Sequence, residues 1–143
     1  MIGKNNPLNI RTSGHYSWNG QTGATRGFCD FEDIALCRRA GAYLLMRSYR
    51  RAKAITIREV ITRWAPAFEN NTNAYIEYVC KRTGLKADTD LVFCSDYASL
   101  LAAMEIFEQG VPTSKREEYF ATARASYMYV INNYCIKKYE IKN

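Results

Sequence analysis

Residues 95–110 read SDYASLLAAMEIFEQG and form the clearest helical segment of the chain. Ser95 and Asp96 are both suitable N-caps, and Gly110 is a typical residue at which a helix ends. These signals place Glu108 at the C-terminal end of the helix, and Glu105, three residues earlier, on its exposed face. A carboxyl group at a helix end is a candidate general acid. The alternative is a solvated surface glutamate, which is common in helices.

The segments on both sides of this helix also carry helical signals. Ser114 followed by Glu117 has the capping-box pattern and predicts a long helix over residues 114–136. On the other side, asparagines at positions 70 and 71 are candidate N-caps for a helix that ends at Gly84.

Two more helices are predicted nearer the N-terminus. Thr56 and Glu59 form another capping-box pattern, and Pro66 should end that helix near Trp64. Apolar residues recur at helical spacing over residues 31–51, which predicts a longer helix there.

Residues 1–30 differ from the rest of the chain. They hold five of the eight glycines, and Trp18-Asn19-Gly20 suggests a short hairpin because Asn-Gly suits a type I′ turn. The sequence therefore predicts a mainly α protein forming a single domain over residues 1–143. In this prediction a turn-rich, partly β lobe (1–30) precedes a helical core (31–110) and an additional C-terminal helix (111–143).

Composition narrows the classes of function. The chain has 143 residues, of which 48% are hydrophobic, and a net charge of +6, as expected for a globular protein that favours anionic partners. Its arginines and lysines are spread over several helices, so nucleic acid is not the expected partner. No apolar run approaches the ~20 residues of a membrane span. No signal peptide is expected, because polar residues directly follow Met1-Ile2-Gly3-Lys4.

The residue types that usually bind metals and cofactors show no such pattern here, so neither a metal nor a cofactor is expected. The number of cysteines is odd and none are spaced as Cys-x-x-Cys, so we expect mostly reduced thiols and no metal site. With a single histidine, His15, no Ser-His-Asp or Cys-His arrangement is predicted, and no glycine-rich nucleotide motif is present. Eleven tyrosines are many for this length, and some should line a groove or an interface.

Two polar clusters are candidate binding segments. The first, residues 5–11, reads NNPLNIR, and its asparagines favour tight turns and offer both donors and acceptors. We interpret it as a turn that contacts a sugar or orients a glutamate. The alternative is a plain turn leading into a strand.

The second cluster, residues 63–72, reads RWAPAFENNT. Here Trp64 and Phe68 would offer faces to sugar rings. Glu69 and Asn70 would supply hydrogen bonds. The alternative places Trp64 in the core and Glu69 at the positive end of the following helix.

With these motifs in this order, the chain resembles a family of small phage and prophage proteins that are usually described as virion or structural proteins. The resemblance covers residues 4–110 and also includes Trp18-Asn19-Gly20, Phe28, Phe31 and Tyr75-Ile76. The NNPLNIR turn is in turn similar to the Asn-rich turn of bacterial glucosaminidases with a lysozyme-like fold. In those enzymes a helix ending in the catalytic glutamate precedes the turn, whereas here Glu108 follows it.

The resemblance implies one of two arrangements. Either the chain is a circular permutant of the lysozyme-like fold, with Glu108 beside the turn in space, or it has lost the catalytic glutamate and kept only a groove. Leu8 departs from the family, which usually has glycine there, and Phe68 stands where it usually has a smaller polar residue.

The expected function is phage-derived, lysozyme-like action on bacterial peptidoglycan, by glycosidic cleavage or glycan binding. Glu108 would be the general acid and Glu69 the second carboxylate. The expected sugar-binding residues are Asn5, Asn6, Asn9, Arg11, Trp64, Asn70 and Tyr75. The alternative is a non-enzymatic virion or host-interaction protein that binds another protein. Either would act in the phage virion, or in the host cytoplasm before release.

Overall fold

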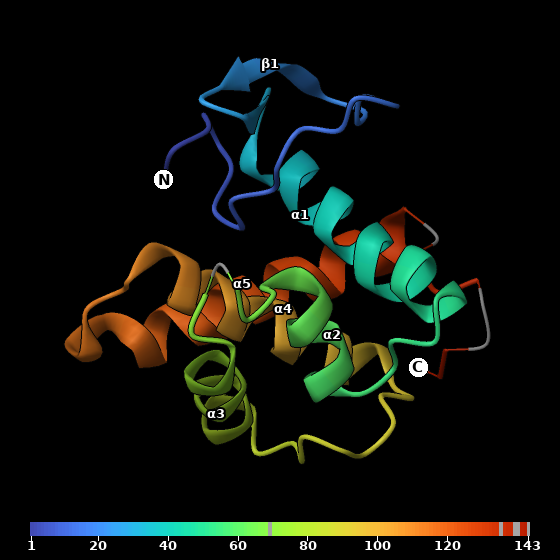
Figure 1. The fold of residues 1–143 in the computed structure, drawn as a ribbon, viewed down its shortest axis with the longest axis vertical. Coiled ribbons are helices and arrows are strands. Elements are labelled where there is room, and N and C mark those ends of the chain that lie inside the picture. The colour runs from blue at the N-terminus through green and yellow to red at the C-terminus, as the bar shows by residue number, and fades with distance from the viewer. Residues whose placement is uncertain (69, 135, 139–140, 143) are drawn as a thin grey trace.

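The computed structural model describes residues 1–68, 70–134, 136–138 and 141–142. Within these ranges the chain forms a two-stranded sheet, β1 (Gln21–Thr25) and β2 (Phe28–Phe31), followed by helices. The helices are α1 (Ile34–Tyr43), η1 (Leu44–Tyr49), α2 (Ile57–Trp64), α3 (Thr72–Thr83), α4 (Cys94–Gln109), η2 (Thr113–Lys115) and α5 (Arg116–Asn133). Figure 1 shows the sheet and the N-terminal segment on one side of α1, with the remaining helices on the other. The predicted mainly α class is confirmed.

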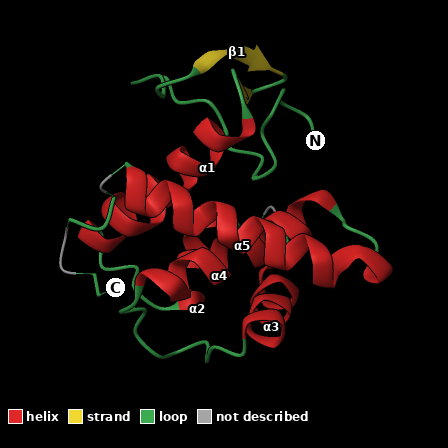
Figure 2. Cartoon of the chain, turned by 180° about the vertical axis from the view of Figure 1, so that it is seen from behind, coloured by secondary structure: helices red, strands yellow, loops and turns green. Residues whose placement is uncertain are grey.

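Helix α4 lies at the centre of the helical part. Ten of its sixteen residues are buried, including Tyr97, Leu100, Leu101 and Met104. It packs against α5, α3 and α1, and α5 also packs on α1, as the view from behind shows (Figure 2). Burial of nearly every face of α4 makes it the element on which the others are assembled.

Glu105 corrects one prediction, because this residue of α4 is fully buried and not on an exposed face. Its carboxylate forms a two-hydrogen-bond salt bridge with Arg38 of α1, with N···O distances of 2.8 and 2.9 Å. It also accepts hydrogen bonds from the hydroxyls of Tyr119 and Tyr127 on α5. A buried charge needs such partners, and they come from helices remote in the sequence, so periodicity within α4 did not reveal them.

The hairpin does not turn where the sequence suggested. Its turn is Arg26-Gly27, both with positive φ (50° and 85°), as in a type I′ turn, and Thr25 pairs with Phe28. The Trp18–Gly20 segment instead forms a turn that leads into β1, closed by a 3.0 Å hydrogen bond from Gln21 N to Trp18 O. An arginine at the first turn position concealed the true hairpin.

Local capping signals located several helix ends correctly. Thr56 and Glu59 form the predicted capping box at the start of α2, which ends at Trp64. Asn71 caps α3, where its side chain accepts a hydrogen bond from Ala74 N at 3.2 Å. The glycines predicted to end α3 and α4, Gly84 and Gly110, are both left-handed.

Three helix starts differ from the prediction. Helix α5 begins at Arg116 without a side-chain cap, because Ser114 lies inside the 3₁₀ turn η2 that follows Pro112. Helix α4 begins at Cys94, after an extended Phe93. Helix α1 begins after its N-cap Asp33, because Phe31 belongs to β2.

Helix α1 widens into the π-helix η1 at Leu44–Tyr49. A π-helix closes its turns with i→i+5 hydrogen bonds and is frequently found at functional sites. The apolar residues of this segment also fit ordinary helical spacing, so the sequence pattern does not distinguish a π-helix from an α-helix here.

The four cysteines within the described ranges, Cys29, Cys37, Cys80 and Cys94, are free thiols, while Cys135 lies outside those ranges. Burial raises the pKa of Cys37 far above its usual value, so this thiol stays protonated. No helix in the described ranges is long and apolar enough to span a membrane. In the same ranges, no three His, Cys, Asp or Glu side chains cluster as metal ligands would.

Candidate functional site

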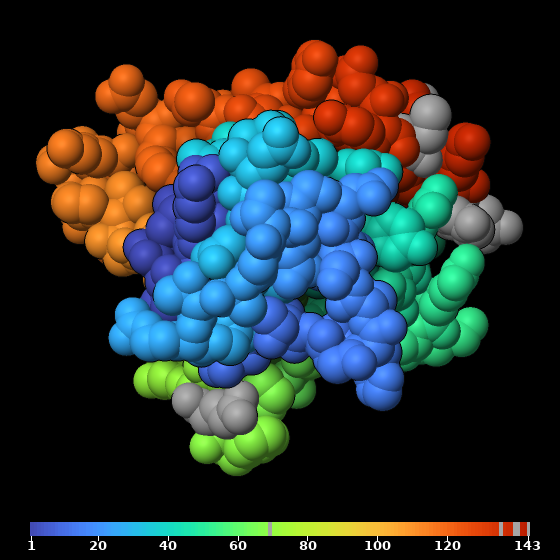
Figure 3. Space-filling view, turned by 90° about the horizontal axis from the view of Figure 1, so that it is seen from above, coloured from blue at the N-terminus to red at the C-terminus, as the bar shows by residue number. Residues whose placement is uncertain are grey.

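A pocket of about 250 Å³ opens where the N-terminal segment meets the C-terminal end of α4. Seen from above, the N-terminal segment, in blue, covers this face of the molecule between α5 and the segment around α2 and α3 (Figure 3). The pocket is lined by Asn9, Ile10, Arg11, Tyr16, Phe28, Leu44, Tyr49, Trp64, Ala65, Asn70 and Glu108. Five of the predicted site residues are therefore brought together here, namely Asn9, Arg11, Trp64, Asn70 and Glu108.

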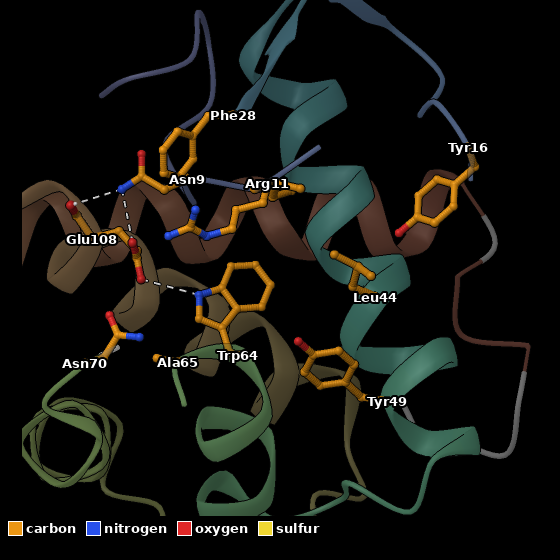
Figure 4. Close-up of a pocket in the computed structure, with 11 residues that line it drawn as sticks. Asn9, Arg11, Tyr16, Phe28, Leu44, Tyr49, Trp64, Ala65, Asn70 and Glu108 are labelled. Atoms are coloured by element: carbon orange, nitrogen blue, oxygen red, sulfur yellow. Dashed lines mark hydrogen bonds between the residues drawn. The ribbon is translucent and has the colours of Figure 1, made fainter. Parts of the chain in front are cut away.

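Glu108 is held by three donors from separate parts of the chain. Asn9 Nδ2 donates to Glu108 Oε1 at 3.0 Å, and Trp64 Nε1 donates to Oε2 at 3.3 Å (Figure 4). The hydroxyl of Tyr75 donates to the same Oε2 at 2.8 Å. Because both carboxylate oxygens are engaged, the group has one fixed orientation at the pocket wall.

Tyr75 supports Glu108 from below the pocket. Its ring is 2% exposed and stacks on Phe107 with centroids 4.0 Å apart. Burial, and then the negative charge of Glu108, raise the pKa of Tyr75 well above its ordinary value. The phenol therefore keeps its proton and remains a hydrogen-bond donor to the carboxylate. Tyr75 was predicted to touch the sugar, but the structure places it behind Glu108.

The Asn-rich turn contacts Glu108, which lies 99 positions after Asn9 in the sequence. Asn9 adopts a left-handed backbone, with φ of 54°, which asparagine tolerates better than most residues. A second contact, 2.7 Å from Gln109 Nε2 to Pro7 O, fixes the turn on the end of α4. The predicted meeting of the N-terminal turn and the Glu108 helix is thereby confirmed.

Asn5 and Asn6 were expected to bind a ligand, but the side chains of both bind backbone groups of this chain. Asn6 is fully buried, and its amide exchanges hydrogen bonds of 2.9 Å with the backbone N–H and carbonyl of Ile10. Asn5 donates to the carbonyls of Phe31 and Glu32 at 3.1 Å. These residues build the turn that presents Asn9, because their side chains replace the missing backbone partners of an irregular loop.

Arg11 lies on the wall opposite Trp64 (Figure 4). Its guanidinium sits over the ring of Phe28, 4.8 Å from the centroid. This stacking keeps a positive charge at the pocket while holding it beside an aromatic face.

The second polar cluster is described in part. Trp64 and Asn70 line the pocket, whereas Glu69 lies outside the described residues. Phe68 is 85% exposed and does not line the pocket.

Sequence reasoning missed several lining residues. Tyr16, Leu44 and Tyr49 belong to the pocket, and the high tyrosine content was the only signal for two of them. Leu44 and Tyr49 come from η1, where they are five residues apart. An α-helical interpretation places such residues on different faces, so it could not group them.

The chain is similar to one curated phage protein. It is 33% identical over 110 residues to Protein P5 of Pseudoalteromonas phage PM2, covering 74% of this chain and 68% of that protein. The chain belongs to the Protein P5 family. Membership of the Protein P5 family confirms the predicted phage association. No protein-family model matches the chain.

Proposed function

We propose that this protein acts on the glycan strands of bacterial peptidoglycan through the Glu108 pocket, with lysozyme-like chemistry in a circularly permuted arrangement. The observation that carries the proposal is the convergence of Asn9, Trp64 and Tyr75 on one carboxylate. A surface glutamate needs no such set of donors, whereas a catalytic acid must be held in one geometry.

The proposed reaction begins when the protonated Glu108 donates its proton to the glycosidic oxygen. The bond between that oxygen and the anomeric carbon then breaks, and its electron pair goes to the oxygen. The remaining cationic sugar is captured by water, which returns a proton to Glu108. Asn9 and Trp64 orient the carboxyl group during both proton transfers.

The walls of the pocket fit a polar sugar. Trp64 and Tyr49 offer aromatic surface, and Arg11 and Asn70 offer hydrogen-bond donors. The net charge of +6 favours approach to anionic wall polymers. Glu108 is the only carboxylate that lines the pocket among the described residues. Glu69 stays the proposed second carboxylate, because it precedes Asn70 in the chain.

The alternative is a virion or host-interaction protein that uses the pocket only to bind. The family relationship to a phage protein is compatible with either role. In that case Glu108 would be a recognition carboxylate rather than an acid.

The test is the Glu108→Gln variant, assayed for cleavage of purified peptidoglycan. The amide keeps the shape of the side chain but has no acidic proton, so cleavage should fall by about 10²–10⁴-fold. The melting temperature should stay within a few degrees of the wild-type value. Glu77→Gln is the matched control, because Glu77 is exposed on α3 and lies outside the pocket.

Glu105→Gln is unsuitable as a control, because Glu105 is buried against Arg38. Equal cleavage by the Glu108 and Glu77 variants would remove Glu108 from the mechanism. Binding of glycan without cleavage by the wild-type protein would support the alternative.

A further inference from the structure

A second pocket, of about 420 Å³, adjoins the Glu108 pocket. Tyr16 lines both, so the two hollows share a wall. The volume lies within the range of pockets that hold small organic ligands. None of its described lining residues belongs to the chemistry proposed for Glu108.

The π-helix η1 and its N-cap residue Tyr43 contribute one pair of side chains to each pocket. Leu44 and Tyr49 line the Glu108 pocket, while Tyr43 and Ser48 line the second pocket. Each pair is five residues apart. Five residues turn an α-helix by about 140° beyond a full turn, which separates such side chains. The wider turn of a π-helix brings them nearer to one face. The widened turn therefore supplies one pair of side chains to each hollow.

The lining of the second pocket combines aromatic surface with polar groups. Trp18 packs edge-to-face against Tyr16 and Tyr43, with centroids 5.1 and 5.8 Å apart. Asn19 and Arg39 add hydrogen-bonding groups, and no carboxylate is among the described lining residues.

Arg39 is already ordered, because its guanidinium lies 4.6 Å from the ring centroid of Tyr134. A donor that is fixed before binding loses less conformational entropy when a ligand arrives. Aromatic rings with nearby donors and acceptors suit the apolar face and the polar edge of a sugar ring.

We infer that the second pocket binds a further sugar ring of the same glycan strand, one that lies beyond the ring held at Glu108. This inference rests on the proposed function, because it extends the glycan strand bound at Glu108 into the adjoining pocket. The shared wall at Tyr16 is the place where the strand passes from one pocket to the other. Arg39 donates to a carbonyl or carboxylate oxygen carried by that ring, and Asn19 contacts its hydroxyls.

The experiment measures binding rather than cleavage. Affinities of the Glu108→Gln protein for a chitin disaccharide and a chitin hexasaccharide are compared by calorimetry. We expect the hexasaccharide to bind more tightly, because only the longer chain fills both pockets. Adding Arg39→Gln or Asn19→Ser should weaken hexasaccharide binding, by about tenfold for Arg39, and leave disaccharide binding unchanged.

Lys86→Gln is the control for the lost charge, because Lys86 is exposed in the loop after α3 and lines neither pocket. If all these variants bind both sugars equally, the second pocket is not part of the site. The proposed catalytic function would survive that result, since cleavage by wild-type protein is measured separately. Binding that depends on length and on Arg39, without any cleavage, would uphold the second pocket and overturn the catalytic role. No binding of either sugar would overturn the inference.

Discussion

Single side chains determine the orientation of Glu108. Asn9, Trp64 and Tyr75 come from the N-terminal turn, the end of α2 and the first turn of α3, and each donates one hydrogen bond to the carboxylate. Tyr75 makes the shortest of the three and is the one shielded from solvent. Loss of its hydroxyl should therefore disturb the carboxylate most, although Tyr75 does not line the pocket.

Tyr75→Phe tests this positioning role. The ring remains stacked on Phe107, but the donor to Glu108 is lost, and cleavage should fall by about tenfold. The carboxyl group should then be able to turn away from the productive geometry, so kcat should fall while KM stays nearly unchanged. The measurement is kcat and KM on purified peptidoglycan, together with the melting temperature. A lower melting temperature with an unchanged kcat would reduce Tyr75 to a packing residue.

Between elements, close packing fixes how the Asn-rich turn meets α1. Leu8 is fully buried against Gly41, and a Cβ atom at position 41 would lie 2.3 Å from Leu8 Cδ1. The missing side chain at Gly41 provides the space that Leu8 needs.

Exchanging Gly41 for alanine should therefore have opposite effects in two backgrounds. In the wild-type protein the clash with Leu8 costs about 1–3 kcal/mol and exceeds the gain in helix propensity of about 1 kcal/mol. In a Leu8→Ala background the clash is gone, so Gly41→Ala should stabilise by about 1 kcal/mol. Urea unfolding of the four proteins in this cycle measures both effects. The same sign in both backgrounds would show that Leu8 and Gly41 do not share this space.

For the molecule as a whole, buried phenols link stability to alkaline pH. Burial and the neighbouring carboxylates raise the pKa of Tyr75, Tyr119 and Tyr127 above the usual value of about 10. Above that pH the unfolded chain releases protons that the folded chain keeps. Stability therefore falls as pH rises past about 10, by up to about 1.4 kcal/mol per pH unit for each phenol.

Urea unfolding between about pH 9 and about pH 11 checks this dependence. Tyr127→Phe should make the decline shallower, because one of the phenols with a raised pKa no longer contributes. Tyr129→Phe, at a position 64% exposed, is the matched control and should leave the slope unchanged. A wild-type stability that stays flat over this range would contradict the prediction.

Signals that act within one helical turn could be predicted from the sequence, whereas contacts between distant residues could not. The capping box at Thr56, the cap at Asn71 and the glycines at 84 and 110 act over one helical turn, so they were predictable. The burial of Glu105 depends on partners 67 residues earlier and 14 and 22 residues later. Periodicity within α4 carries no information about such partners.

The candidate site also contains residues that could be predicted from the sequence and residues that could not. Its chemistry was visible in Glu108, Asn9 and Trp64, because the motif order suggested that two distant segments meet. Its walls were not visible, because Leu44 and Tyr49 enter through a π-helix. Asn5 and Asn6 were predicted to bind a ligand, whereas their side chains bind backbone groups. A turn asparagine can bind either partner with the same atoms, so the sequence does not distinguish the two roles.

The hydrogen bond between Asn9 and Glu108 joins residues 99 positions apart. Closing so long a loop costs chain entropy, which must be repaid by contacts that form at the same time. During synthesis Asn9 leaves the ribosome 99 residues before Glu108 does. The pocket therefore cannot assemble on a nascent chain that stops short of the end of α4.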